Sequence, residues 1–251
     1  MISPDPSRRF LAAEWRNLVM LNYEVDPSTL AGHVPAGCEI DLWHGRAFVS
    51  VVGFQFLSTR VLGVPIPFHR DFEEVNLRFY VRRKEEGEWR RGVVFVRELV
   101  PRRAIAFIAN QVYGENYLAL PMRHVVELRD GRPPSRVSYE WRRTDTWEGV
   151  TASFSGPPCL PADDALETFI TEHYWGYSKQ SDHATLEYQV EHPRWRVWRA
   201  ETASLECDVD ALYGSAFREP LSGSPSTAFV ADGSPVLLRA AGVRARSPGG
   251  G

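Results

Sequence analysis

Lysine is the scarcest charged residue in this chain of 251 residues. Only Lys84 and Lys179 are present, although lysine and arginine together number 29. Cysteine is also rare, and Cys38, Cys159 and Cys207 are odd in number and widely separated. This pattern predicts neither a disulfide framework nor a cysteine metal site, so we expect a reduced, cytoplasmic setting.

Several familiar signatures are missing as well. No apolar run approaches the roughly 20 residues of a membrane-spanning helix, and residues 1–13 lack the apolar stretch of a signal peptide. A net charge of −3 gives no general attraction to nucleic acid. The seven histidines show no metal-site spacing, and we find no glycine-rich phosphate loop, dinucleotide fingerprint or nucleophile elbow. These absences predict no metal, no cofactor, no nucleic-acid partner and no membrane.

Two strands with polar residues among apolar ones dominate the sequence. Residues 73–82 alternate, which is typical of a strand with two different faces. The apolar face carries Val75, Leu77, Phe79 and Val81, and the polar face carries Glu74, Asn76, Arg78, Tyr80 and Arg82. Residues 93–100 are almost continuously apolar, which indicates a strand buried on both faces. The charged turn between them predicts an antiparallel hairpin.

Arg97 and Glu98 interrupt this second strand. Burying an ion is costly unless it is paired or hydrogen-bonded, and these neighbours point to opposite faces. Each needs a partner elsewhere, and Glu74 and Arg78 on the preceding strand are the obvious candidates. The cluster is either a structural ion-pair network or the floor of a polar pocket, because perturbed charges gather at functional sites.

The remaining sequence predicts an α+β fold, mainly antiparallel β with a few helices packed around it. Further strands are expected at 15–25, 38–43, 46–59, 121–129, 135–143, 147–154, 184–191 and 195–206, with a closing hairpin formed by 226–231 and 235–239. Helices are expected after Asp26, from Pro101 to Gly114, from Asp163 to about Tyr174 and after Asp208. Without a convincing linker, residues 1–251 form one domain, with a core of about 14–240 and flexible tails at 1–12 and 242–251.

Weaker signals leave alternatives open. His69 is either a loop residue bonded to the backbone or a proton carrier at a pocket mouth. The aromatic segments 172–177 and 192–198 either pack in the core or form a wall facing a ligand. Carboxylates near amides at 73–76 and 115–117 hint at acid–base chemistry.

Five segments together resemble the YqjF-like family of uncharacterised conserved bacterial proteins, which share the acetoacetate decarboxylase-like fold. They are WRNLVMLNYEV, the long segment from Val49 to Arg83, RRGVVFVRELVPRRAIAFIANQVYGENYLALPMRH, FITEHYWGY and EHPRWRVW, within residues 14–238. The resemblance implies a cone-like β-barrel with helices around it and a polar internal cavity. It implies no established reaction.

A more distant resemblance to acetoacetate decarboxylase itself extends to particular residues. Its acidic strand motif matches FEEV, which implies a pocket carboxylate at Glu74, and its Arg-Glu-Leu motif matches Arg97, Glu98 and Leu99. The lysine pair that performs Schiff-base chemistry in that enzyme corresponds to Arg102 and Arg103. Arginine stays protonated and is a poor nucleophile. With Lys84 expected in a hairpin turn and Lys179 in a polar loop after a helix, we expect no Schiff-base chemistry.

Three functions remain open. The first is binding of a small carboxylate or keto-acid metabolite in the cavity, through the ligand-binding candidates Glu74, Asn76, Arg78, Arg97, Glu98, Arg102 and Arg103. The second is a lyase or decarboxylase-like enzyme with Glu74 or His69 as acid or base. The third is a structural or interaction protein. The sequence also leaves open whether the chain forms a homo-oligomer.

Overall fold

The computed structural model is built mostly of β-strands and describes residues 9–65, 69–103, 106, 110, 114–128, 135–239 and 242–245. Within these residues, one sheet has twelve strands and another has four. The large sheet contains β1 (Arg9–Val25), β2 (Cys38–Ile40), β3 (Ala47–Val61), β4 (Val64–Pro65), β5 (Phe72–Glu85), β6 (Glu88–Val100), β7 (Tyr117–Ala119), β11 (Trp175–Ser181), β12 (Ala184–Glu191), β13 (Val197–Arg199), β15 (Thr227–Arg239) and β16 (Gly242–Ala245).

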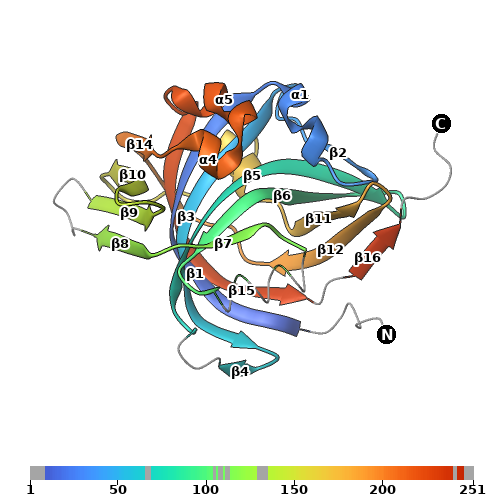
Figure 1. Ribbon diagram of the computed structural model, residues 1–251, viewed down its shortest axis with the longest axis horizontal. Helices are drawn as coiled ribbons and strands as arrows, with labels where there is room; N and C mark the ends of the chain where they lie inside the picture. The colour runs from blue at the N-terminus through green and yellow to red at the C-terminus, as the bar shows by residue number, and fades with distance from the viewer. Residues whose placement is uncertain are drawn as a thin grey trace.

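The smaller sheet and the helices complete the fold. The four-stranded sheet consists of β8 (Met122–Glu127), β9 (Ser135–Arg142), β10 (Trp147–Phe154) and β14 (Thr202–Glu206). The helices of the described residues are all short: α1 (Pro27–Leu30), α3 (Leu166–Thr171), α4 (Val209–Tyr213) and α5 (Arg218–Ser222), with 3-10 turns η1 (Ala31–His33) and η2 (Ser215–Phe217). Helices α1, α4 and α5 lie together at one end of the molecule (Figure 1).

The large sheet curves strongly (Figure 1). Hydrogen-bonded neighbours follow the order β15-β1-β3-β5-β6-β11-β12, and β12 also pairs with β15. The path of paired strands therefore returns to its starting strand. The predicted mainly β architecture with few helices is confirmed, but the large sheet is mixed, because β6 pairs in parallel with both β7 and β11.

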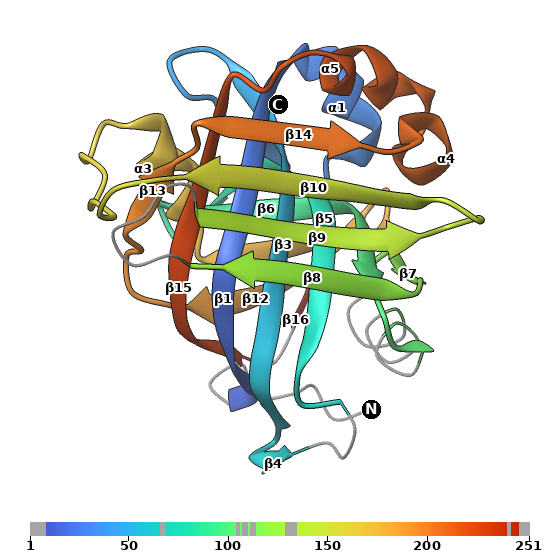
Figure 2. The same ribbon diagram turned by 90° about the vertical axis from the view of Figure 1, so that its left-hand side faces the viewer.

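The four-stranded sheet lies across the outer face of the large sheet, over β15, β1, β3 and β5 (Figure 2). Tyr139, Trp141 and Val150 from the small sheet share one apolar cluster with Val51 and Val75 from the large sheet. A second cluster, with Phe48, Phe54, Tyr80 and Trp195 among its members, fills the inner side of the large sheet. The large sheet is thus buried on both faces, which explains its almost continuous apolar runs.

The central hairpin forms as predicted. β5 and β6 pair antiparallel, with Glu85 opposite Glu88 at the turn. Glu86 and Gly87 both have positive φ, 51° and 89°, as a two-residue hairpin turn requires. The alternation in β5 is confirmed: its apolar set lies in the cluster between the sheets, whereas Glu74, Asn76 and Arg78 line a cavity on the inner side.

Several predicted element bounds were wrong. Residues 227–239 are one strand, β15, and not a hairpin. Gly233 has φ +80° inside this strand, and a Cβ there would lie 2.0 Å from the Trp15 carbonyl oxygen, so the Asp-Gly pair uses the freedom of glycine within a strand whose register against β1 continues past it. Residues 195–206 divide into β13 and β14, which belong to different sheets.

Other corrections concern the tails and the region around 165–181. β1 begins at Arg9 and β16 covers Gly242–Ala245, so both expected tails are partly strand. The helix after Asp163 is only Leu166–Thr171, with Ala165 at its N-cap. Lys179 lies in β11 and not in a loop. Most of the helix predicted from Pro101 to Gly114 lies outside the described residues. Among those that are described, no helix is long and apolar enough to cross a membrane.

Candidate functional site

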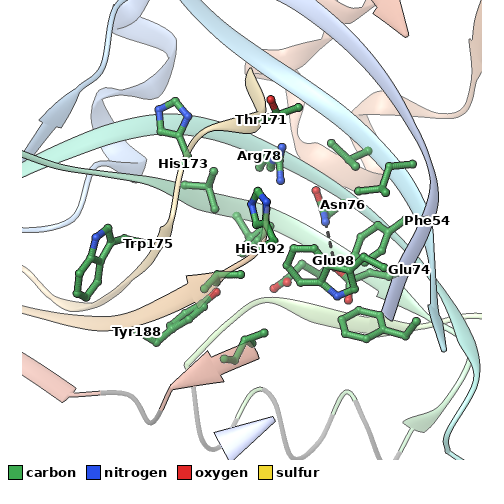
Figure 3. A pocket seen from close by; sticks show the side chains of 18 of the residues that line it. Phe54, Glu74, Asn76, Arg78, Glu98, Thr171, His173, Trp175, Tyr188 and His192 are labelled. Atoms are coloured by element: carbon green, nitrogen blue, oxygen red, sulfur yellow. Dashed lines mark hydrogen bonds between the residues drawn. The ribbon is translucent and has the colours of Figure 1, made fainter. Parts of the chain in front are cut away.

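A cavity of about 60 Å³ lies on the inner side of the large sheet (Figure 3). This volume holds a few water molecules or a ligand with a handful of non-hydrogen atoms. Its polar lining residues are Glu74, Asn76, Arg78, Glu98, Tyr117, Thr171, His173, Tyr188 and His192, and aromatic side chains such as Trp15, Phe54, Trp175 and Trp195 form much of the rest. Such a pocket, mostly apolar with a few convergent polar groups, is typical of a small-molecule site.

Strand periodicity places the polar floor of this cavity. Glu74, Asn76 and Arg78 are alternate residues of β5, so their side chains share one face. Glu98 of β6 lies directly opposite Asn76 in the antiparallel register. All four side chains are buried, with exposed fractions of 3%, 2%, 9% and 1% in sequence order. Burial of so many polar groups at one place predicts a functional role.

Two carboxyl groups, those of Glu74 and Glu98, line one side of the cavity, and a third, that of Glu115, contacts the lining residue Tyr188. Asn76 donates a 3.0 Å hydrogen bond to Glu74 Oε1, and the Tyr117 hydroxyl donates one of 3.3 Å to Glu74 Oε2. Glu115 accepts a 3.1 Å hydrogen bond from the Tyr188 hydroxyl. Arg97 does not pair with Glu74 as the sequence suggested, because it lies opposite Leu77 and faces the other side of the sheet.

Burial of these acids raises their pKa values. The pKa of Glu74 rises to about 7, mainly because burial disfavours its charged form, while Asn76, Tyr117 and Arg78 act against the rise. Burial also raises the pKa of Glu115 to about 8 and that of Glu98 well above its usual range, and the negative charges of neighbouring carboxyls add to both shifts. Near neutral pH the cluster therefore carries much less negative charge than three free glutamates would.

Arg78 is the cation on the cavity wall. Its Nη2 donates a 3.3 Å hydrogen bond to the Ile170 carbonyl oxygen, and its guanidinium lies 5.7 Å from the centre of the Tyr80 ring. Its Nε has no hydrogen-bond partner, and it forms no ion pair within the described part of the chain. A buried guanidinium with an unused donor is suited to a carboxylate from outside the chain.

His173 forms the opposite end of the cavity, away from Glu74 (Figure 3). Asp41 Oδ2 lies 3.1 Å from His173 Nε2 and accepts a 2.6 Å hydrogen bond from Arg91 Nε. Burial lowers the pKa of His173 to about 4. Although burial alone would raise the pKa of Asp41, the hydrogen bonds from His173 and Arg91 lower it. His173 is therefore neutral near pH 7, with Nε2–H donating to the ionised Asp41 and Nδ1 left as an acceptor.

Aromatic rings surround the polar floor. The Trp15 ring meets Phe54 edge to face with centroids 5.3 Å apart, and it lies 6.3 Å from Trp195. His192 stacks on Trp195 at 4.2 Å. Burial lowers the pKa of His192 to about 4. In the segment 192–198, Trp195 packs in the core and also lines the cavity. Core packing and a position on the cavity wall, which the sequence left open as alternatives, are therefore combined in one residue.

The structure brings together only part of the predicted site. Glu74, Asn76, Arg78 and Glu98 line the cavity. Arg97 is half-buried on the other face of β6, while Arg102 and Arg103 are exposed. His69 follows β4 in the chain and is half-buried, and like these three arginines it is not among the residues that line the cavity.

Sequence reasoning missed other residues of the site. Glu115 and Tyr117 carried a weak signal as carboxylates near amides, and His173 carried one as part of the aromatic segment 172–177, but Tyr188 carried none. All of them come from segments far from β5 and β6 in the chain. The structure also shows that Lys84 is exposed and that Lys179, in β11, pairs with Asp182 at 3.1 Å. In the described residues no group of three His, Cys, Asp or Glu side chains is arranged to hold a metal ion.

Solved structures with this arrangement of strands define its fold class. An acetoacetate decarboxylase-like enzyme from Sphingomonas wittichii RW1 matches with a TM-score of 0.67 at 13% identity, over 96% of this chain and 95% of that chain. The enduracididine biosynthesis enzyme MppR, complexed with pyruvate, matches with a TM-score of 0.64 at 14% identity, over 98% and 92%. The chain therefore has the acetoacetate decarboxylase-like fold.

The family is shown by sequence. Residues 12–235 match the DUF2071 family, described as an uncharacterized conserved protein, and the chain belongs to this family. The uncharacterized protein YqjF of Bacillus subtilis (strain 168) is 24% identical over 202 residues, which cover 79% of this chain and 78% of YqjF. The resemblance inferred from the sequence motifs is thereby confirmed.

Proposed function

We propose that this protein binds a small carboxylate, such as a keto acid, in the cavity on the inner side of the large sheet. In this proposal the large sheet forms a β-barrel around the ligand. The observation that carries the proposal is Arg78. Its guanidinium is buried, bonded to one backbone carbonyl and unpaired with any described carboxylate, although an uncompensated buried charge is costly. A ligand carboxylate would compensate it through charge-assisted hydrogen bonds.

The neighbouring acids support this assignment because burial raises their pKa values. With Glu98 and Glu115 largely protonated near pH 7 and Glu74 titrating at about 7, an anion entering the cavity meets less repulsion than three ionised carboxylates would impose. The fold neighbour MppR has been solved with pyruvate, a small keto acid that has about the size this cavity holds.

The cavity chemistry proposed here excludes a covalent imine with lysine. Neither Lys84 nor Lys179 lines the cavity, and an arginine cannot replace the amine because its guanidinium stays protonated. The ligand is therefore held by noncovalent contacts alone, with Arg78 on its carboxylate and Asn76 and Glu74 orienting the remainder.

The test is the affinity of purified protein for pyruvate, measured by isothermal titration calorimetry with Arg78→Gln beside the unchanged chain. Loss of a charge-assisted pair costs about 1.5–3 kcal/mol, so we expect affinity to fall by about 10- to 100-fold. Arg82→Gln is the matched control, because Arg82 lies on the same strand but pairs with Glu39 at the surface. Equal affinities for the Arg78 variant and the unchanged protein would refute the proposal.

A second candidate is a lyase acting on the same ligand class, with Glu74 as acid or base. It is favoured by the pKa of Glu74, about 7, since proton transfer is most efficient when that value lies near the working pH. Glu74→Gln separates the two functions. If the unchanged protein turns over a keto acid and the variant still binds it but no longer turns it over, the protein is an enzyme that uses Glu74. If the unchanged protein shows no turnover, binding alone is the function.

A further inference from the structure

When Glu98 is ionised, acceptor atoms outnumber donors among the unused polar atoms around the cavity. Glu98 Oε2, Asn76 Oδ1 and His173 Nδ1 have no hydrogen-bond partner in the described chain, whereas the unused donors are Trp15 Nε1 and Arg78 Nε. Each of these atoms belongs to a residue that lines the cavity. A buried polar atom without a partner costs about 1–3 kcal/mol, so a ligand that fits this site supplies donors as well as a carboxylate.

The carboxyl cluster shows which donor suits the site. Glu74 and Glu115 raise the pKa of Glu98, and Glu74 raises that of Glu115. Glu74 and Glu98 line the cavity, and Arg78 is the one arginine among its described lining residues. Glu98 is 1% exposed and still has an unpartnered oxygen. A positive group placed beside Glu74 and Glu98 would favour their ionised forms, so that they lose their protons as it binds and accept its hydrogen bonds.

The walls fit the same kind of group. An ammonium has three N–H donors and no acceptor, and an amidinium is a planar donor with no acceptor, so either matches a surface rich in acceptors. Aromatic faces attract cations when the site is desolvated, and Trp15, Tyr188 and His192 border the polar floor. A keto oxygen, by contrast, is only an acceptor. It can accept a hydrogen bond from protonated Glu98, but it leaves Asn76 Oδ1 unsatisfied.

We propose that the ligand of this cavity is a compact zwitterion, with a carboxylate held at Arg78 and an ammonium or amidinium group held among Glu74, Asn76 and Glu98. This inference rests on the proposed function, because it keeps the carboxylate at Arg78 and adds a second recognition element. It assigns the cavity to small amino or amidino carboxylic acids and ranks simple keto acids below them.

The test compares matched ligands on the unchanged protein by isothermal titration calorimetry. Glycine, β-alanine and 4-aminobutyrate are measured against acetate, propionate and butyrate, and pyruvate and 4-oxopentanoate represent the oxo acids. We expect at least one amino acid to bind about tenfold or more tightly than its matched carboxylic acid and than either oxo acid.

The variants locate the second recognition element. In Glu98→Gln the preference for the amino acid over its matched acid should fall to less than about threefold, because the amide, unlike Glu98, cannot ionise and pair with a bound ammonium. Glu88→Gln, at the exposed start of β6, should keep the full preference. Arg78→Gln should weaken amino acids and simple acids together.

The outcomes separate the two proposals. If the simple acids or the oxo acids bind as tightly as every amino acid, the zwitterion is refuted while carboxylate binding stands. If amino acids bind but Arg78→Gln leaves their affinity unchanged, Arg78 does not hold the carboxylate, and both the proposed function and the zwitterion proposal are refuted. Absence of binding by the whole panel, with correctly folded protein, counts against both.

Discussion

Glu74 shows how one buried side chain connects this cavity to solution pH. The carboxyl lies on a strand face that is closed to solvent, and burial raises its pKa from 4.5 to about 7. Between these two values the folded chain keeps a proton that the unfolded chain has lost. The free energy of unfolding contributed by Glu74 is therefore complete below pH 4.5 and is lost as pH rises through 7.

We expect Glu74→Gln to remove this dependence. The shift corresponds to about 3 kcal/mol, so the unchanged protein should lose up to about that much stability relative to the variant as pH rises from 5 to 9. Urea unfolding at several pH values measures the difference. His173 and His192, whose lowered pKa values cost stability as pH falls from 6.5 toward 4, affect both proteins alike. A difference that stays constant with pH would contradict the assignment.

Among the elements, β3 is packed unusually closely against the smaller sheet. Gly53 lies where β3 meets β9 and β10, and a Cβ there would stand 2.6 Å from Tyr139 Cδ2 and 3.1 Å from Val150 Cγ1. The Tyr139 ring is fully buried and its hydroxyl donates a 2.9 Å hydrogen bond to the Asn17 carbonyl oxygen. The ring therefore has little freedom to move away from a larger residue.

Gly53→Ala should accordingly destabilise the protein by about 1–3 kcal/mol through overpacking. Gly32→Ala is the control, because no atom lies within 4 Å of a Cβ at that position. Both are measured by urea denaturation at one pH. The physical reason for a glycine at position 53 is visible only with the second sheet in place. Equal midpoints for the two variants would show that the sheets can separate without cost.

For the whole molecule, the placement of lysine limits the chemistry that the fold supports. The chain shares its fold with acetoacetate decarboxylase-like enzymes, but both of its lysines lie outside the cavity. Lys84 is exposed beside the Trp89 ring, with Nζ 5.8 Å from the ring centre, and Lys179 pairs with Asp182. Both lysines are exposed to solvent, so neither amine lies where it could attack a carbonyl bound in the cavity.

Treatment with pyruvate and borohydride should therefore leave the mass of the intact protein unchanged. The control is the Lys84→Arg, Lys179→Arg double variant, which reports any reaction at the N-terminal amine. An adduct on the unchanged chain that disappears in the double variant would overturn the noncovalent mechanism. The same pair of samples, titrated with pyruvate, shows whether binding is independent of lysine.

The sequence by itself determined which side chains of β5 and β6 share a face, because strand periodicity is local and a one-residue shift would expose the apolar set. It also determined that the lysine of these strands, Lys84, lies beside the hairpin turn, at the opposite end of β5 from Glu74. Only the tertiary structure decided that Glu115, Tyr117, His173 and Tyr188 join them, because these residues are brought in by β7, β12 and the segment after α3. The parallel pairing of β6 with β7 and β11 makes those contacts, and pairing between segments distant in the chain leaves no periodic signal in the sequence.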